Sequence, residues 1–238
     1  MLRAIFALTI LGLIGGCASK GDVDDLRADI AALSAKIDGM SAGGAKAAAP
    51  GADDEKAASE LYNAARALAG KGQNDEAKAK LVEMNKKYGA TRTAQRGSRL
   101  LKELSLVGSP AQAISTSKMY QGEAPDVSSG VSMLVFWEKW CPHCRREMPE
   151  MEETFAKYKG KVSFIGLTKQ SKGTSDEDVV SFIDENKLTY PIGKEDGAVS
   201  NAYAVSGIPA AAVVKDGVVV WRGHPGSLSD DMLDGFLK

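Results

Sequence analysis

Cysteine and histidine are scarce in this chain, and their scarcity excludes several kinds of site. The 238 residues include three cysteines, Cys17, Cys141 and Cys144, and two histidines, His143 and His224. A zinc site built on Cys141 and Cys144 would need a second cysteine pair or two histidines at ligand spacing. His143 lies between those cysteines and His224 stands alone, so the sequence predicts no resident metal and no cofactor.

Excess charge and long apolar runs are absent as well. The 30 basic and 31 acidic residues leave a net charge of −1, so nothing indicates a nucleic-acid partner. The apolar run from Ala4 to Ile14 is shorter than the about 20 residues that a membrane-spanning helix needs. Aromatic residues are few (6%) and alanine is abundant, which favours a partly helical protein. The length allows one large domain or two small ones.

Cys141 and Cys144 stand at the start of an expected helix. The apolar run Met133–Trp137 is typical of a buried strand, and the residues after Cys144 are typical of a helix. This arrangement places the first sulfur beside unsatisfied backbone N–H groups at the positive end of the helix dipole, which favours the thiolate. We therefore expect Cys141 to be an exposed, attacking nucleophile. Cys144 can reach back within the first turn and close a disulfide with it.

This stretch resembles the thioredoxin superfamily, and within it the membrane-tethered TlpA/ResA-like branch. The resemblance rests on Phe136-Trp137, Trp140-Cys141-x-x-Cys144, Glu147, Pro149 and Gly207-Ile208-Pro209. It implies a thioredoxin-like α/β fold over residues 109–238, a central sheet flanked by helices and built as βαβ followed by ββα. It also implies thiol:disulfide oxidoreductase activity on protein thiols and disulfides, together with a redox partner protein.

The resemblance assigns further residues to the site. Pro209 is predicted to follow a cis peptide bond and to face the cysteine pair. Ile208 would present its backbone to an extended substrate segment. Trp140 is expected to form part of the groove wall and to tune the site by packing.

The two residues between the cysteines are expected to tune their chemistry. Pro142 removes one backbone N–H and fixes φ in the first turn of the helix. His143, when protonated, would add positive charge beside Cys141; the alternative is a solvent-facing residue without a role. A Pro-His pair also occurs between the cysteines of strongly oxidising DsbA-like proteins.

Glu147 is the predicted acid of the site. ResA-like proteins place an acid at this position, where it could accept a proton from Cys144 or raise the pKa of a thiol. The alternative is a carboxylate favoured by the helix dipole alone. The buried acid that the superfamily places beneath the disulfide has no counterpart, because Val135 occupies its position. Proton transfer is therefore left to Glu147, Glu138, Lys139 or water.

Other segments of the C-terminal part give local expectations. Ile114 is expected to begin an edge strand, in a region that looks shorter than the N-terminal strand pair usual in the family. Val162–Leu167 is expected to form the second central strand. Ser175 and Asp178 are typical of a helix N-terminus. Lys215-Asp216-Gly217 indicates a hairpin.

The N-terminal residues resemble a bacterial lipoprotein signal. A basic residue, an apolar core and the sequence Ile14-Gly15-Gly16-Cys17 predict a signal peptide over residues 1–16 and lipidation at Cys17. The alternative is an ordinary signal peptide with an incidental cysteine. The lipid would hold the protein at the periplasmic face of the envelope, and Ala18, where no Asp stands, favours the outer membrane.

Residues 17–52 are expected to hold the lipid anchor, a short coiled coil and a linker. Apolar residues recur at alternating spacings of three and four, as in a coiled-coil seam: Val23, Leu26, Ile30, Leu33, Ile37 and Met40. The seam predicts a homo-oligomer, a trimer or a dimer, through residues 23–40. The alternative is one amphipathic helix packed on its own chain. The low-complexity stretch Ser41–Ala52 is typical of a flexible linker.

Residues 53–108 predict two or three helices, and their pattern weakly resembles one tetratricopeptide-like hairpin plus half of the next. A single repeat cannot bury a core, so this segment must pack on another surface. That surface is the thioredoxin-like domain, a neighbouring subunit or a client protein. A spacer role and a partner-binding role are both open.

Two other functions compete with the oxidoreductase hypothesis. One is a metal-handling lipoprotein, with Cys141, Cys144 and either His143 or Glu147 as ligands of copper or zinc. The other is a non-catalytic envelope scaffold that works through its helical parts. Within the oxidoreductase hypothesis, the ResA-like resemblance favours a reductase, whereas Pro-His favours an oxidase or an isomerase.

Overall fold

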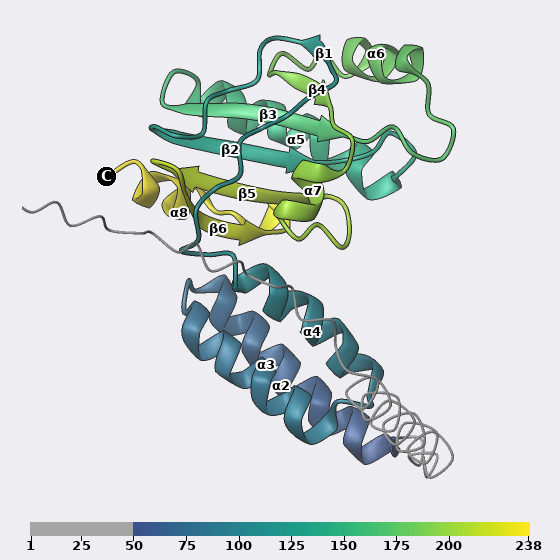
Figure 1. Ribbon diagram of the computed structural model, residues 1–238, viewed down its shortest axis with the longest axis vertical. Coiled ribbons are helices and arrows are strands. Elements are labelled where there is room, and N and C mark those ends of the chain that lie inside the picture. The colour runs from purple at the N-terminus through teal and green to yellow at the C-terminus, as the bar shows by residue number, and fades with distance from the viewer. Residues whose placement is uncertain (1–49) are drawn as a thin grey trace, which may run out of the picture. The chain divides into compact units, whose positions relative to one another are not determined.

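The computed structural model describes residues 50–238, and its centre is a six-stranded mixed sheet (Figure 1). The strand order is β1-β4-β3-β2-β5-β6, with β2, β3 and β4 parallel and the other pairs antiparallel. The predicted signal peptide, the lipidation at Cys17, the coiled-coil seam of residues 23–40 and most of the linker lie outside the described residues. The strands are β1 (Lys118–Gln121), β2 (Val131–Phe136), β3 (Val162–Thr168), β4 (Ile192–Lys194), β5 (Ala210–Lys215) and β6 (Val218–Gly223).

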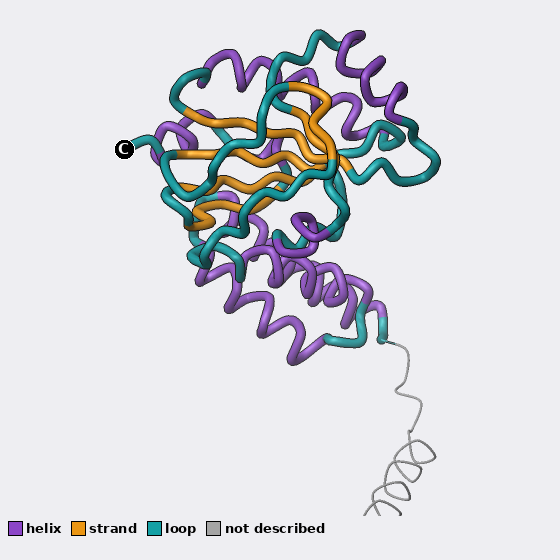
Figure 2. Tube along the Cα trace, turned by 45° about the horizontal axis from the view of Figure 1, so that its top comes forward, coloured by secondary structure: helices purple, strands orange, loops and turns teal. Residues whose placement is uncertain are grey.

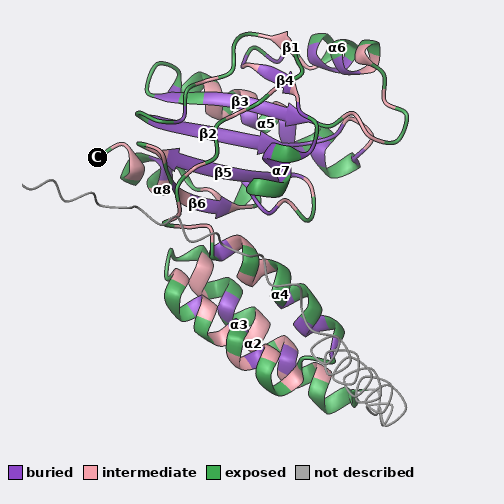
Figure 3. Ribbon diagram, viewed as in Figure 1, coloured by how far each residue is buried: buried purple, intermediate pink, exposed green. Residues whose placement is uncertain are grey.

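Strand β2 is buried on both faces. All six of its residues are buried, as expected for a strand with neighbours on both edges and helices on both faces. Because side chains alternate along a strand, Met133 and Val135 enter one apolar core and Leu134 and Phe136 the other. Figure 3 shows this burial along β2, β3 and β5.

Each face of the sheet has its own cover. Helices α5, α6 and α8 pack on the core that contains Met133, and α7 packs on the opposite core, with the chain that leads to β1. Figure 2 shows the helices on either side of the strands. The bounds are α5 (Pro142–Tyr158), α6 (Asp176–Glu185), α7 (Ala198–Ala202), the 3₁₀ turn η1 (Pro225–Ser227) and α8 (Asp230–Phe236). The expected order, βαβ followed by ββα, is confirmed by β2-α5-β3 and β5-β6-α8.

Three helices precede the sheet: α2 (Ala52–Gly70), α3 (Asn74–Tyr88) and α4 (Arg92–Leu104). Their core is small and rich in alanine, and it comprises Ala58, Ala65, Ala77, Leu81, Met84, Ala94 and Leu104. The segment after α4 then joins the sheet, because the Gly108 N–H donates to the Val219 carbonyl at 2.8 Å. The helical segment therefore packs partly on its own chain, through β6.

Several local predictions can be checked directly. Ser175 and Asp178 form a reciprocal capping box at the start of α6. Asp216 and Gly217 both have positive φ, at 48° and 77°, as the tight turn between β5 and β6 requires. The expected edge strand at Ile114 is wrong: Ile114 packs against the core behind α7, and the edge strand β1 begins at Lys118.

No helix among residues 50–238 combines the length and the apolar character needed to cross a bilayer.

Candidate active site

The two cysteines lie where β2 leads into α5. Cys141 is the N-cap residue of α5, and Pro142 is the first helical residue, a position where its missing N–H costs no helical hydrogen bond. The Cys141 N–H donates to the Glu138 carbonyl at 3.0 Å, and the Cys141 carbonyl accepts from the Arg145 N–H at 3.1 Å. Both sulfurs are free thiols. This geometry holds Cys141 at the N-terminal end of a 17-residue helix.

Cys141 is more enclosed than the sequence predicts. Only 5% of its surface is exposed, so the expectation of an exposed nucleophile is wrong for this conformation. The loop before β5 covers it: Cys141 Sγ lies 3.7 Å from the Ile208 carbonyl oxygen, to which the thiol donates. The Ile208–Pro209 peptide bond is cis, as predicted. A substrate sulfur must therefore approach Cys141 alongside the Ile208 backbone.

Cys144 lies in the first turn of α5 and is fully buried. Burial raises the pKa of its thiol to about 12, and a backbone hydrogen bond from Glu138 opposes this effect. The neighbouring Cys141 and the charge of Glu138 also favour the protonated form. At neutral pH, Cys144 therefore needs a proton acceptor before it can attack another sulfur.

A buried carboxylate lies close to Cys144, and it belongs to Glu138. Glu138 is 2% exposed; its Oε2 accepts hydrogen bonds from the Ser171 N–H at 3.1 Å and the Thr168 hydroxyl at 3.3 Å. Its Oε1 has no hydrogen-bond partner among residues 50–238. The sequence indicates Glu138 as one of several possible proton acceptors and does not single it out. The signal that could have singled it out is a charged residue directly after an otherwise apolar buried strand.

Glu147, the acid that the resemblance selects, lies on α5 and faces a different neighbour. Its Oε1 is buried and has no hydrogen-bond partner in the described part of the chain. His224 Nδ1 lies 4.0 Å from Glu147 Oε1, and that nitrogen accepts from the Gly226 N–H at 3.1 Å. Burial raises the pKa of Glu147, and His224 partly offsets the effect. The negative charge of Glu138 contributes to the raised pKa of the Cys144 thiol.

The predicted tuning residues surround the cysteines without entering the core. His143 is exposed, and its Nδ1 lies 2.8 Å from an Arg146 guanidinium nitrogen. Trp140 donates from Nε1 to the Ser171 hydroxyl at 2.9 Å, and the Lys172 ammonium lies 3.4 Å from the centre of its ring. Trp140 therefore fixes the loop after β3 beside the cysteine pair, which suits a groove wall.

The described residues contain no group of three His, Cys, Asp or Glu side chains placed to hold a metal ion. The ligand set of the metal-handling hypothesis, with Cys141, Cys144 and either His143 or Glu147, is therefore not assembled here. His143 turns to Arg146, and Glu147 turns to His224.

Comparison with known proteins agrees with this geometry. The sequence profile of the AhpC/TSA family matches residues 107–222. Residues 107–222, just under half of the chain, are therefore similar to this family of thioredoxin-like proteins. Among curated proteins, the thiol-disulfide oxidoreductase ResA of Oceanobacillus iheyensis is 33% identical over 107 residues, which cover 44% of this chain and 55% of the relative. The thioredoxin-like protein YneN of Bacillus subtilis is 27% identical over 120 residues, which cover 50% of this chain and 71% of that protein.

The likeness covers about half of this chain. This chain spans about half the length of the ResA protein that it matches. Among solved structures, StoA from Bacillus subtilis superposes with a TM-score of 0.45 at 23% identity, covering 54% of this chain and all of the other. A thioredoxin-like protein solved in its oxidised form gives a TM-score of 0.49 at 19% identity, over 55% of this chain and 95% of the other.

Proposed function

We propose that this protein is a thiol:disulfide oxidoreductase that acts on protein cysteines from a lipid-anchored position outside the cytoplasm. One observation carries the proposal: Cys141 Sγ lies at the start of α5, 3.7 Å from the Ile208 carbonyl oxygen, with buried Cys144 one turn away. The family match and the names of the curated relatives support the same chemistry.

The reaction needs two sulfur exchanges. In the reducing direction, the Cys141 thiolate attacks one sulfur of a client disulfide, forms a mixed disulfide and releases the other client sulfur as a thiolate. Cys144 then loses its proton and attacks Cys141 Sγ. The mixed disulfide breaks, the Cys141–Cys144 bond forms, and the second client sulfur leaves. Two electrons pass from the protein to the client, and the same steps in reverse oxidise a client dithiol.

Glu138 is the proton acceptor that this mechanism assigns to Cys144. Its Oε1 is buried and has no hydrogen-bond partner in residues 50–238, and its charge acts on the Cys144 thiol. A cavity of about 10 Å³ borders Glu138, Lys169 and Ile208, room for roughly one water molecule. That water would carry the proton between Glu138 and the solvent beside Ile208.

The location and the assembly rest on the sequence. The motif that ends at Cys17 supports lipidation at the periplasmic face of the envelope, with Ala18 favouring the outer membrane. The seam of residues 23–40 supports a trimer or a dimer. A redox partner protein would restore the cysteine pair after each turnover. The reduction potential of the Cys141–Cys144 pair would assign the direction of electron flow. A reductase is expected near the potential of thioredoxin, about −270 mV, and an oxidase near the potential of DsbA, about −120 mV.

The test is turnover of a disulfide-bonded protein by the full chain. Cys141→Ser should abolish the activity, because the first exchange has no nucleophile. Cys144→Ser should accumulate the mixed disulfide with the client, because the second exchange cannot occur. Cys17→Ser should leave turnover in detergent unchanged while releasing the protein from membranes. Undiminished turnover by Cys141→Ser would overturn the proposal.

A further inference from the structure

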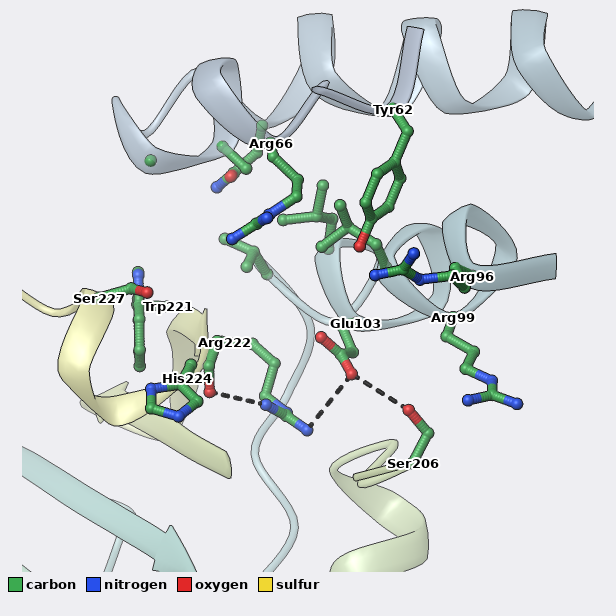
Figure 4. A pocket seen from close by; sticks show the side chains of 17 residues that line it. Tyr62, Arg66, Arg96, Arg99, Glu103, Ser206, Trp221, Arg222, His224 and Ser227 are labelled. Carbon is green, nitrogen blue, oxygen red and sulfur yellow. Dashed lines mark hydrogen bonds and ion pairs between the residues drawn. The ribbon is translucent and has the colours of Figure 1, made fainter. Parts of the chain in front are cut away.

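A cavity of about 470 Å³ lies between the helical segment and β6 (Figure 4). Helices α2 and α4 form one side, and β6, η1 and the loop before Ile208 form the other. Its volume is in the range of pockets that bind small ligands or single side chains with their backbone. The active-site chemistry described above does not use it.

Positive charge dominates the lining of this cavity. Four arginines border it, Arg66, Arg96, Arg99 and Arg222, against a single carboxylate, Glu103, among the described lining residues. The chain as a whole carries a net charge of −1, so the cationic character is local. Leu100, Leu104, Val107 and Trp221 supply apolar wall.

The arginines differ in how their charge is used. Arg222 is 3% exposed, and it donates to the carbonyls of Tyr203 at 2.8 Å and Gly223 at 3.0 Å. Its only acidic neighbour within residues 50–238 is Glu103, 3.9 Å away. Glu103 in turn accepts from the Ser206 hydroxyl at 3.3 Å. The Arg222–Glu103 pair therefore links α4 to β6 of the sheet.

Arg66 and Arg99 have no such partner among residues 50–238. Both are exposed, and neither makes a hydrogen bond or an ion pair from its guanidinium to another described residue. The Arg96 guanidinium lies over the Tyr62 ring, 5.5 Å from its centre. Figure 4 shows Arg66 and Arg96 reaching into the space between α2 and α4. A guanidinium group suits a carboxylate, which it can bind through two parallel hydrogen bonds.

The cavity adjoins the substrate approach to Cys141. Ser206 lines it and stands two residues before Ile208, a backbone span of at most about 7 Å. His224 also lines it and faces Glu147 on the same helix as the cysteines. A polypeptide that runs alongside the Ile208 backbone can therefore place a neighbouring residue in the cavity.

We propose that this cavity is a specificity pocket for acidic residues that flank the reactive cysteine of a client polypeptide. Client carboxylates would bind Arg66, Arg96 and Arg99, while aliphatic parts of the same segment would contact Leu100 and Trp221. This inference rests on the proposed oxidoreductase function, because it assigns the class of client on which the site acts.

Two matched peptides test the pocket. Both carry one disulfide in the same central sequence, and they differ by a flank of three glutamates or three glutamines. The full chain should reduce the acidic peptide with a kcat/KM about tenfold higher than that of the glutamine peptide. The difference should lie in a lower KM, and it corresponds to the free energy of one charge-assisted contact. The ratio of the two kcat/KM values should fall below about threefold in the double variant Arg66→Gln/Arg99→Gln, and also in the wild-type chain at high salt. Lys56→Gln/Lys102→Gln removes two exposed charges from the same two helices outside the cavity and should retain the preference.

A binding measurement distinguishes failure of the pocket proposal from failure of the oxidoreductase proposal. The Cys141→Ser/Cys144→Ser protein cannot turn over, and fluorescence anisotropy should still show tighter binding of the acidic peptide. Acidic binding without turnover by the wild-type chain would overturn the oxidoreductase function and leave the pocket standing. Equal binding of the two peptides would overturn the pocket. Displacement of the acidic peptide by an equal concentration of free succinate would also overturn the client assignment, because the ligand would then be a small dicarboxylate.

Discussion

The sheet region and the helical segment bury very different interiors. Two cores with several aromatic rings lie on the two faces of β2, and one of them contains the cysteine pair, whereas the interior of α2–α4 consists of alanines with Leu81, Met84 and Leu104. A larger apolar area removed from water gives a larger stabilisation. The sheet region is therefore built to hold a reactive site rigidly. The helical segment has a smaller apolar interior, and it carries exposed charged residues.

Shortening one leucine in each interior should show that the two regions differ in stability and in their importance for activity. Leu134→Ala in the sheet should cost about 3 kcal/mol of the free energy of unfolding, since a buried leucine leaves a cavity, and should reduce activity at 37 °C. Leu81→Ala should loosen the helices while reduction of a small disulfide persists. Denaturant unfolding followed by tryptophan fluorescence, beside activity, measures both. Equal loss of activity in the two variants would contradict a separable helical segment.

The two buried acids of the sheet region, Glu138 and Glu147, should differ in their effect on the cysteine pair. Glu138→Gln should slow closure of the Cys141–Cys144 disulfide about 100-fold at pH 7, as expected for loss of a general base, and should flatten its pH dependence. Glu147→Gln, the matched control on α5, should change that rate less than about threefold, because its carboxylate lies beside His224. Stopped-flow tryptophan fluorescence would follow the closure. The reverse order of effects would return the role to Glu147.

Gly97 offers a smaller test in the helical segment. A Cβ there would meet Met84 Cε at 1.9 Å and Leu81 Cδ2 at 3.2 Å. The methionine end can move, so Gly97→Ala should destabilise the helices by about 1 kcal/mol despite its better helix propensity. Calorimetry should place the change in the transition of the helical segment. Gly70→Ala is the control, because open space surrounds that position.

The smallest expected effect concerns pH. Burial raises the pKa of Glu147 above its ordinary value of 4.5, so the folded protein retains a proton that the unfolded chain releases. The stabilisation from this proton is complete below pH 4.5 and is lost as the pH rises through the folded-state pKa. Glu147→Gln should therefore weaken the fall in stability above pH 4.5. The measurement is the melting temperature of the wild type and of Glu147→Gln as a function of pH above 4.5. Parallel curves for the two proteins would show that the Glu147 carboxylate has its ordinary pKa, which would contradict the prediction.

Much of the sheet region could be predicted because its signals are local. The apolar run through Val135 and the turn residues Asp216 and Gly217 each determine structure within a few positions. The short edge strand at Lys118 was misplaced to Ile114, because its pairing with β4 depends on contacts distant in sequence. The burial of Cys141 was missed for the same reason, since the covering carbonyl belongs to Ile208.

The acid beside Cys144 shows a different limit. A motif directs attention to Glu147 by its position, whereas the environment of Glu138 depends on the loop that carries Ser171. The arginine-lined cavity likewise joins residues from α2, α4 and β6, and no spacing in the sequence could reveal it.

The proposed mechanism requires that Cys141 and Cys144 form a reversible disulfide, which a redox titration can detect. The full chain would be equilibrated in glutathione buffers of graded potential, alkylated and mapped by mass spectrometry. A disulfide that links Cys141 to Cys144 is expected to appear in one two-electron transition, with a tenfold change in ratio for each ~30 mV. Persistence of two free thiols, or of glutathione on Cys141 without closure by Cys144, would contradict the account.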